Sequence, residues 1–298
     1  MEITFLGTSD AIPTAERNHT AILLSYANEK ILVDCGEGTQ RQFYIAKISP
    51  TKLTRLLITH WHGDHVLGIP GLLQSLGFSG YSKTLRIYGP PKTKDFFNYI
   101  LKSFRSIYID KIKIQINEIR PGKIVDERDF SVFAEKLKHY NCFGYRLEEK
   151  DKWKINLSYI KKAGIKPGPI LKKLQQGKNI TWNGKRIKVK DATFVVKGKV
   201  VAFIFDTGYC KEAIKLAKNA DIVIAESTYL TEHEDLADAR FHLTAKQAAT
   251  IAKKAKAKKL YLLHISRRYK GKENLVLKEA KKVFPSSHIA KDFMTIGI

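Results

Sequence analysis

Short runs of β-branched and aromatic residues recur along the chain and predict strands. The runs are bounded by Gly, Asp, His or Pro, as strands usually are. They occupy residues 2–6, 20–25, 30–34, 55–59, 85–88, 130–137, 200–205, 222–226 and 259–263. The chain therefore has enough predicted strand for extended sheets.

Between these runs, the apolar residues are spaced as in amphipathic helices. The helical patterns occupy residues 66–77, 92–104, 210–218, 244–257 and 272–283. Strands that alternate with helices are typical of layered α/β proteins. We predict an α/β fold in which two central sheets are faced by helices, with residues 1–298 in a single domain.

One segment departs from this pattern. Residues 150–182 are rich in Gly and Lys, include Gly164, Gly168 and Gly177, and show no clear core-forming period. We predict an arm inserted into the domain at about residues 150–182.

The charge of the chain is concentrated in and near this arm. The whole chain has 53 basic and 29 acidic residues, a net charge of +24. Residues 150–190 hold 13 basic residues and one acid, which is half of that net charge. A lysine-rich proteome explains an evenly spread charge, but a focused patch favours a phosphate backbone as the partner.

The cysteines and the N-terminal sequence indicate a cellular location. Cys35, Cys142 and Cys210 are odd in number and form no C-x-x-C pair, so we expect neither disulfides nor a cysteine zinc site. The start MEITFLGTSD does not resemble a signal peptide, and no stretch has the roughly 18 to 20 apolar residues that span a bilayer. We expect a cytoplasmic protein with no membrane partner.

The motif His60-Trp61-His62-Gly63-Asp64-His65 is the strongest chemical feature of the sequence. In an extended loop, His60 and His62 point to the same side and can reach one metal ion. Gly63 permits a turn, after which Asp64 and His65 open a helix and suit a neighbouring ion. Four potential ligands in six residues predict a metal site.

Two metal ions need more ligands than this loop provides. His139, Asp206 and His264 each follow a predicted strand, and a buried carboxylate such as Asp206 is costly unless it is paired or binds a metal. We predict two Zn²⁺ ions, although Mn²⁺ or Fe²⁺ could also fit. Asp206 is shared between the ions, and the remaining ligands are His60, His62 and His139 on one ion and Asp64, His65 and His264 on the other.

These residues resemble the metallo-β-lactamase superfamily and, within it, the tRNase Z family along essentially the whole chain. The matching segments are FLGTS at 5–9, DCGEGTQRQ at 34–42, HWHGDH at 60–65, PG at 70–71, H-x₄-GYR at 139–146, FDTG at 205–208, AESTY at 225–229, HLTA at 242–245 and H-x-S-x-RY at 264–269. The resemblance implies an αββα sandwich with the metals at one sheet edge.

The resemblance also implies roles for residues around the metals. Asp34 would orient a ligand imidazole through its second nitrogen. His242, paired with Glu226, resembles the family's proton donor to the leaving 3′ oxygen. Asp64 would orient the nucleophile or accept its proton. Phosphate would be held by Ser266, Arg268 and Tyr269.

In the tRNase Z family, a Gly- and Pro-containing arm at this place clamps the tRNA body from the other subunit of a homodimer. Here the insertion carries LKKLQQG, and Lys172 and Lys173 are its expected contacts with tRNA. The family's P-x-K-x-R-N loop, associated with CCA discrimination, corresponds to residues 13–18. Arg17 and Asn18 match it as expected substrate contacts, but Ala15 replaces the lysine.

The resemblance implies hydrolysis of precursor tRNA that removes the 3′ trailer and leaves a 3′-OH on the tRNA and a 5′-phosphate on the trailer. An alternative is a hydrolase of small phosphodiesters or lactones on the same fold, against which the basic arm argues. A β-CASP nuclease would need a longer segment between Asp206 and His264. A non-catalytic RNA-binding module predicts lost ligands, and no ligand is missing.

Overall fold

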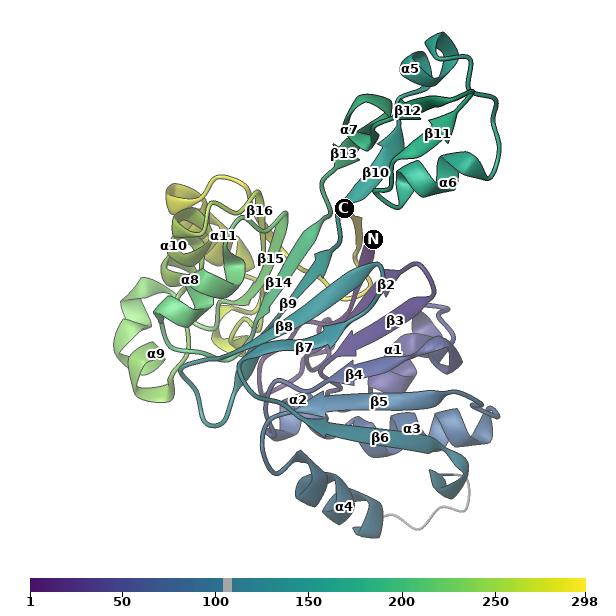
Figure 1. The fold of residues 1–298 in the computed structure, drawn as a ribbon. Helices are drawn as coiled ribbons and strands as arrows, with labels where there is room; N and C mark the ends of the chain where they lie inside the picture. The colour runs from purple at the N-terminus through teal and green to yellow at the C-terminus, as the bar shows by residue number, and fades with distance from the viewer. Residues whose placement is uncertain (104–108) are drawn as a thin grey trace. The chain divides into compact units, whose positions relative to one another are not determined.

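The computed structural model of the protein describes residues 1–103 and 109–298 (Figure 1). These residues form two compact units. The larger unit comprises residues 1–126, 132–147 and 200–298, and the smaller unit comprises residues 127–131 and 148–199. No helix in the described ranges is long and apolar enough to cross a membrane. Cys35, Cys142 and Cys210 are all free thiols.

The larger unit contains two sheets, which are seven-stranded within the described residues. In the first sheet, β1, β2 and β3 are antiparallel, whereas β3, β4, β5 and β6 are parallel. Parallel strands place their carboxyl ends at one edge of the sheet, where the loops that follow can meet. The strand order is β18 (Thr295–Gly297), β1 (Glu2–Gly7), β2 (Ala21–Tyr26), β3 (Glu29–Val33), β4 (Arg55–Leu57), β5 (Thr84–Gly89) and β6 (Lys113–Glu118).

The second sheet is also parallel over four of its strands, β14 to β17. Its buried strands are nearly continuous apolar runs, such as IVIAE at 222–226, because both faces are covered. The strand order is β17 (Ser287–Ile289), β16 (Lys259–Leu263), β15 (Ile222–Glu226), β14 (Val200–Ile204), β9 (Phe143–Glu149), β8 (Phe130–Lys136) and β7 (Gly122–Asp126).

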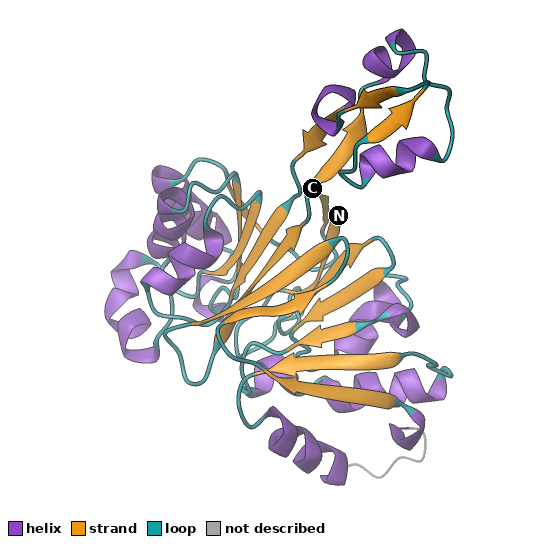
Figure 2. Cartoon of the chain, in the orientation of Figure 1, coloured by secondary structure: helices purple, strands orange, loops and turns teal. Residues whose placement is uncertain are grey.

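Helices cover the outer faces of the two sheets, which gives the predicted αββα sandwich (Figure 2). The first sheet is faced by α1 (Thr39–Ile45), α2 (Gly63–Val66), α3 (Ile69–Phe78) and α4 (Thr93–Ser103), with short 3₁₀ turns η1 (Pro50–Lys52) and η2 (Ile109–Lys111). The second sheet is faced by α8 (Lys211–Ala217), α9 (Glu234–Arg240), α10 (Ala245–Lys254) and α11 (Glu273–Val283), with η3 (Thr231–His233) and η4 (Arg267–Tyr269).

Each outer layer has its own hydrophobic core. On the first sheet, Leu56 and Ile87 pack in one cluster with Leu73 of α3. On the second sheet, Leu262 packs in one cluster with Ala248 of α10, whose small side chains let the helix lie close to the strands. Burying a side chain of leucine size stabilises the fold by about 1.5–3 kcal/mol, so these layers hold the strand ends rigidly in place.

The two sheets are joined at the edge where β4 ends. The Phe143 N–H of β9 donates to the Thr59 carbonyl at 3.0 Å, and the Tyr145 hydroxyl donates to the Ile58 carbonyl at 2.5 Å. Both acceptors lie directly before His60. The second sheet therefore fixes the position of the loop that carries the histidine motif.

The smaller unit has a hydrophobic core of its own, although the sequence pattern indicated none. Ile160, Leu174 and Ile187 are buried together there, contributed by elements too short to show a period. Its elements are β10 (Lys152–Ile155), α5 (Leu157–Lys162), α6 (Ile170–Gln175), β11 (Ile180–Trp182), β12 (Lys185–Ile187), α7 (Val189–Ala192) and β13 (Thr193–Val196).

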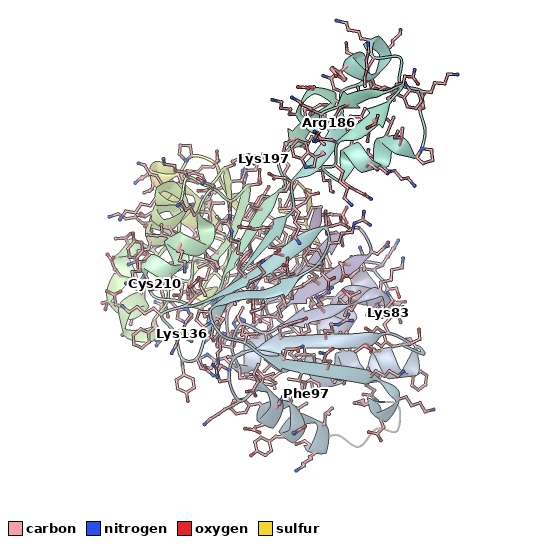
Figure 3. The ribbon with its side chains drawn as sticks, in the orientation of Figure 1. Lys83, Phe97, Lys136, Arg186, Lys197 and Cys210 are labelled. Atoms are coloured by element: carbon pink, nitrogen blue, oxygen red, sulfur yellow. The ribbon has the colours of Figure 1, made fainter. Side chains whose placement is uncertain are left out.

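The basic residues of the smaller unit lie on its surface, where Figure 3 labels Arg186 and Lys197. Lys172 and Lys173 of α6 are both exposed. The unit extends to residue 199, beyond the predicted end of the arm at about residue 182, because β13 returns to pair with β10.

The predicted helices are all present, with boundaries that differ by up to three residues, and one of them is divided. The predicted helix 66–77 is split into α2 and α3, because Pro70 lies in the first turn of α3 and has no N–H with which to continue the hydrogen bonds of α2. The predicted helix 92–104 is α4, Thr93–Ser103, and its last predicted residue lies outside the described residues.

Candidate metal centre

The predicted ligands all lie at the edge where the strands of both sheets end. Strand β4 delivers the histidine motif, and α2 begins within it. The positions are the loop after β4 for His60 and His62, α2 for Asp64 and His65, the loop after β8 for His139, the segment after β14 for Asp206 and the segment after β16 for His264.

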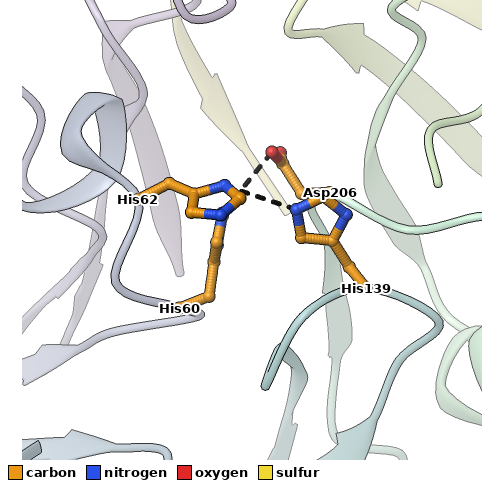
Figure 4. A group of neighbouring side chains, drawn as sticks. All are labelled: His60, His62, His139 and Asp206. Carbon is orange, nitrogen blue, oxygen red and sulfur yellow. Dashed lines mark hydrogen bonds and ion pairs between the residues drawn. The ribbon is translucent and has the colours of Figure 1, made fainter. Parts of the chain in front are cut away.

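One group comprises His60, His62, His139 and Asp206, as predicted from the sequence (Figure 4). Their ligand atoms all lie within 4.8 Å of one another. The Nε2 atom of His139 is 3.3 Å from Nδ1 of His62, and Nε2 of His60 is 3.6 Å from Oδ2 of Asp206. This spacing is small enough for one ion to contact all four side chains.

A second group comprises Asp64, His65, Asp206 and His264. The Nε2 atom of His65 lies 3.2 Å from Oδ2 of Asp64 and 3.3 Å from Oδ1 of Asp206. The Nε2 atom of His264 lies 3.3 Å from each of the same two oxygens. Asp206 thus presents Oδ2 to the first group and Oδ1 to the second.

Buried polar atoms that make no hydrogen bond show that these groups fit a metal ion. Within the described ranges, Nε2 of His60, Nε2 of His65 and Oδ1 of Asp206 are buried and make no hydrogen bond. A buried polar group without a partner costs about 1–3 kcal/mol, and a cation between them would remove that cost. Imidazole and carboxylate donors without a thiolate suit Zn²⁺ and similar divalent ions.

Four of the histidines are oriented in the same way. In each, Nδ1 donates to a fixed oxygen, which leaves Nε2 as the free ligand atom facing the cluster. The acceptors are Thr59 Oγ1 for His60 (3.1 Å), Asp34 Oδ2 for His65 (2.6 Å), Phe241 O for His139 (3.2 Å) and Thr228 Oγ1 for His264 (2.9 Å).

Asp34 anchors this arrangement, in the position that the sequence predicted for it. Besides His65, its carboxylate accepts the Thr59 N–H at 2.8 Å and the Thr59 hydroxyl at 2.7 Å. Asp34 and His264 both have positive φ, 58° and 56°, which is costly for residues other than glycine. The turns after β3 and β16 thus keep this strain at the site.

The charges of the cluster strongly perturb its histidines. Burial opposes the charged form of His65, but the carboxylates of Asp206, Asp64 and Asp34 outweigh it and hold its pKa well above the usual value. Burial, with His65 nearby, holds the pKa of His60 well below the usual value. A cation bound near these three carboxylates would therefore be stabilised by their negative charge.

His242 and Glu226 form a pair beside the second group, as the sequence predicted. Nδ1 of His242 lies 3.0 Å from Oε1 of Glu226. Burial opposes the charged imidazole, but Glu226 outweighs it and raises the pKa of His242 to about 9. His242 therefore holds a proton at neutral pH and could donate it.

A pocket of about 250 Å³ adjoins this pair. Ser266 and Arg268, the predicted phosphate contacts, line it together with His242 and His264. Arg240 also lines the pocket. The sequence analysis did not identify Arg240, because this residue belongs to no motif. The remaining lining residues are Asp10, Ala11, Ile12, Thr228, Tyr229 and Arg267.

Of the predicted substrate contacts in the larger unit, three are not among the residues that line this pocket. Tyr269 is buried, and its hydroxyl accepts the Leu230 N–H at 3.0 Å. Arg17 is also buried and donates to the Thr8 hydroxyl at 2.7 Å and the Ala290 carbonyl at 2.8 Å.

The third is Asn18, whose side-chain amide donates to the Glu37 carbonyl at 2.7 Å. In the structure these three side chains hold loops together, which spacing in the sequence does not reveal. The sequence analysis also did not identify Thr59 and Thr228 as acceptors for ligand histidines. Their positions close to His60 and Glu226 in the sequence are a signal that could have identified them.

Comparison with known proteins agrees with this geometry. Residues 1–111 match the family described as anti-Pycsar protein Apyc1, and residues 165–265 match the beta-lactamase superfamily domain. Human tRNase Z, short form, has a similar crystal structure, with a TM-score of 0.71 and 27% identity over 100% of this chain and 99% of that chain. YhfI of Bacillus subtilis, a metallo-beta-lactamase fold protein, has the same TM-score at 20% identity over 99% of this chain and 98% of that chain.

The sequence relatives span the whole chain. Ribonuclease Z of Methanothermobacter thermautotrophicus is 42% identical over 100% of this chain and 97% of that protein. Ribonuclease BN of Escherichia coli K12 is 41% identical over 100% of both chains. With the fold, the two ligand groups and this identity along its whole length, the chain belongs to the ribonuclease Z family.

Proposed function

We propose that the protein is a zinc-dependent endoribonuclease that removes the 3′ trailer from precursor tRNA, in the cytoplasm. It leaves a 3′-OH on the tRNA and a 5′-phosphate on the trailer. The observation that carries the proposal is the pair of ligand groups sharing Asp206, with the His242–Glu226 pair beside them. The full-length identity to ribonuclease Z supports the choice of substrate.

Two ions would be held by the two groups described above, with Asp206 between them. When bound, such a pair lowers the pKa of water towards neutral and stabilises charge on the phosphate oxygens. The Nδ1 hydrogen bonds fix the tautomer of these imidazoles and keep Nε2 turned towards the ions. Asp64, whose Oδ2 faces both His65 and His264, orients the attacking oxygen.

His242 supplies the proton for the leaving group. Because its Nδ1 faces Glu226, Nε2 remains for the substrate. With its pKa raised to about 9, the imidazole is protonated at neutral pH and can pass a proton to the 3′ oxygen of the tRNA as the bond to phosphorus breaks. Glu226 stabilises the charged form before transfer and holds the ring in one orientation.

The pocket beside His242 would bind a phosphate of the substrate strand. Arg268 and Arg240 provide guanidinium donors, and Ser266 provides a hydroxyl. Arg240 donates to the Tyr229 hydroxyl at 3.1 Å, and the guanidinium carbon of Arg268 is 5.9 Å from the centroid of the same ring. The phenol of Tyr229 therefore separates and orients the two cations.

The smaller unit would bind the tRNA body as an inserted arm of the single catalytic domain. Its exposed lysines, Lys172 and Lys173 among them, match a phosphate backbone. Contacts to the backbone read the shape of the tRNA and not its bases. This would let one enzyme act on many precursor tRNAs.

A homodimer would use the outer face of α1 and α3. Tyr44 is 85% exposed and Phe78 is 71% exposed. A groove of about 620 Å³ beside them is lined by apolar residues, including Phe43, Ile45 and Ile48, together with the polar side chains of Gln40, Lys47, Ser49, Ser75 and Ser79. Exposed apolar surfaces of this kind commonly mark protein interfaces.

The test is cleavage of an end-labelled precursor tRNA by the zinc-loaded protein, with the cut site mapped. We expect cleavage near the discriminator base, and loss of cleavage in His65→Ala. Small phosphodiesters and lactones are assayed in parallel. Turnover of those compounds without any cleavage of precursor tRNA would overturn the proposal in favour of a small-molecule hydrolase.

A further inference from the structure

Phe241 occupies a backbone conformation that is costly for an aromatic residue. It lies at the C-terminal end of α9 with φ 55° and ψ 50°, the left-handed region. Glycine or asparagine fills this position in most helix ends, and a bulky side chain costs about 1–2 kcal/mol there. Its side chain is 47% exposed, so burial offsets only part of that cost. A requirement of the fold alone would be met better by glycine.

Phe241 is placed directly against the metal centre. Its carbonyl accepts a hydrogen bond from Nδ1 of His139 at 3.2 Å, and the next residue is His242, the proposed proton donor. The Nζ atom of Lys138, which precedes His139, lies 5.9 Å from the centroid of the phenyl ring. A half-exposed aromatic ring with an adjacent ammonium group therefore belongs to the residue that bonds to His139 and directly precedes His242.

We propose that Phe241 is a stacking platform for one unpaired nucleobase beside the scissile phosphate, with Lys138 attracting the phosphate that adjoins that base. The inference rests on the proposed function, because it requires a single-stranded RNA segment at the centre. Exposed aromatic rings flanked by basic residues bind single strands in this way, since every base has a face that can stack.

The chemistry of the surroundings favours a base over a protein segment as the occupant. The ring is a single half-exposed side chain in a loop, too small for a protein interface. The ammonium group of Lys138 beside the ring attracts a polyanion. Stacking is also tolerant of base identity, as an enzyme acting on varied trailers requires.

The test combines a protein variant with a modified substrate. Phe241→Gly removes the ring and relieves the backbone, and Phe241→Trp keeps a ring. Phe293→Gly is a matched control, because Phe293 also has positive φ, 66°, and is 40% exposed, but its backbone N–H donates to the Phe5 carbonyl and not to a ligand histidine. Each protein is assayed on precursor tRNAs carrying one abasic nucleotide at successive positions around the cut, with kcat/KM and Tm measured.

We expect one position where the abasic site lowers kcat/KM of the unaltered protein by roughly tenfold, the effect of losing one base stack. For Phe241→Gly, kcat/KM on the intact substrate is about tenfold lower than for the unaltered protein. An abasic nucleotide at that position does not lower the kcat/KM of Phe241→Gly further. Phe241→Trp and Phe293→Gly behave as the unaltered protein does. Phe241→Gly has a Tm equal to or above that of the unaltered protein.

Equal sensitivity of Phe241→Gly and the unaltered protein to abasic sites at every position would overturn the platform while leaving the proposed function intact. Cleavage of the intact substrate by Phe241→Gly at the normal rate would overturn it as well. Failure of the unaltered protein to cut any precursor tRNA would instead remove the proposed function, and the platform with it.

Discussion

Oε1 of Glu226 lies 3.0 Å from Nδ1 of His242 and also accepts the backbone N–H of Thr207 at 2.7 Å. Thr207 directly follows Asp206, the carboxylate common to both ligand groups. The partner of the proposed proton donor is therefore fixed by the same segment that positions the central ligand. Proton donation and metal binding share one structural support.

This pairing sets the alkaline limit of cleavage. The pKa of His242 is raised to about 9, so its protonated form is present below that pH and is lost as pH rises through it. We expect cleavage to fall above about pH 9. In Glu226→Gln the charge that raises the pKa is absent, so the fall should begin at lower pH. The measurement is kcat as a function of pH for both proteins. If kcat falls at the same alkaline pH in both, Glu226 does not have this role.

Thr228 should influence metal affinity without touching a metal. Its hydroxyl donates to Oε2 of Glu226 at 2.6 Å and accepts from Nδ1 of His264 at 2.9 Å. Thr228→Val keeps the shape but leaves Nδ1 of His264 without an acceptor. We expect zinc affinity to fall by about 10- to 100-fold, measured by competition with a chelator.

Thr250→Val provides a comparison for that measurement, because the Thr250 hydroxyl bonds only within α10, to the Lys246 carbonyl at 2.7 Å. We expect its zinc affinity to be unaltered. If both valine variants bind zinc as tightly as the unaltered protein does, the hydroxyl of Thr228 is not part of the support for His264.

Zinc should raise the thermal stability of the protein. At a free concentration about 100-fold above Kd, binding adds about 2.7 kcal/mol. This corresponds to a rise in Tm of about 5 °C for a domain of this size. His65→Ala should lose most of that shift. His288→Ala, which alters a histidine outside both ligand groups, should keep it. Calorimetry with and without a chelator decides between these outcomes.

The smaller unit should be removable without loss of the catalytic fold. Its two chain ends lie together, because the Glu149 N–H donates to the Lys199 carbonyl at 2.8 Å. We expect a variant in which a short glycine linker replaces residues 151–197 to fold, to hydrolyse small phosphodiesters, and to show a KM for precursor tRNA raised at least tenfold. An unchanged KM would show that the basic unit does not hold tRNA.

The ion pair between Glu29 and the buried Arg55 should make stability depend on pH. Burial opposes the charged form of Glu29, but Arg55 and Thr54 outweigh it and lower its pKa. This contribution is present above the unfolded pKa of about 4.3 and is lost as pH falls through the lower, folded pKa.

We expect Glu29→Gln to cost about 2 kcal/mol at pH 7. Breaking fully buried pairs costs about 3–5 kcal/mol, and the partial exposure of Glu29 reduces that cost. Urea unfolding at pH 7 and at pH 3 measures the difference between the two proteins. The difference should shrink at pH 3, and an equal difference at both values would contradict the assignment.

The structure has a strand at each predicted run of β-branched and aromatic residues. Strand β6 escaped prediction although KIQINE alternates polar and apolar residues, the pattern of a half-buried strand, and β9 escaped prediction because FGYRLEE mixes apolar and charged side chains without a clear period. They are strands because neighbouring strands pair with them, and pairing depends on residues far away in the sequence. The core of the smaller unit also depends on residues that are far apart in the sequence, and it was not predicted for the same reason.

The ligand groups could be predicted because they combine a local motif with strand ends, and a sheet brings strand ends together. The structural roles of Arg17 and Tyr269 could not be predicted, because a motif does not show whether a side chain faces the cleft or the interior. Arg240 and Phe241 belong to no motif. Their positions follow from how α9 ends, which is settled by tertiary packing.

The ligands come from both sheets, which has a consequence for how the protein comes apart. His60 and His65 follow a strand of the first sheet, whereas Asp206 and His264 follow strands of the second. A bound ion would be a cross-link between the two halves of the sandwich, as a disulfide is in a secreted protein. Separation of the halves would then require the ion to leave first.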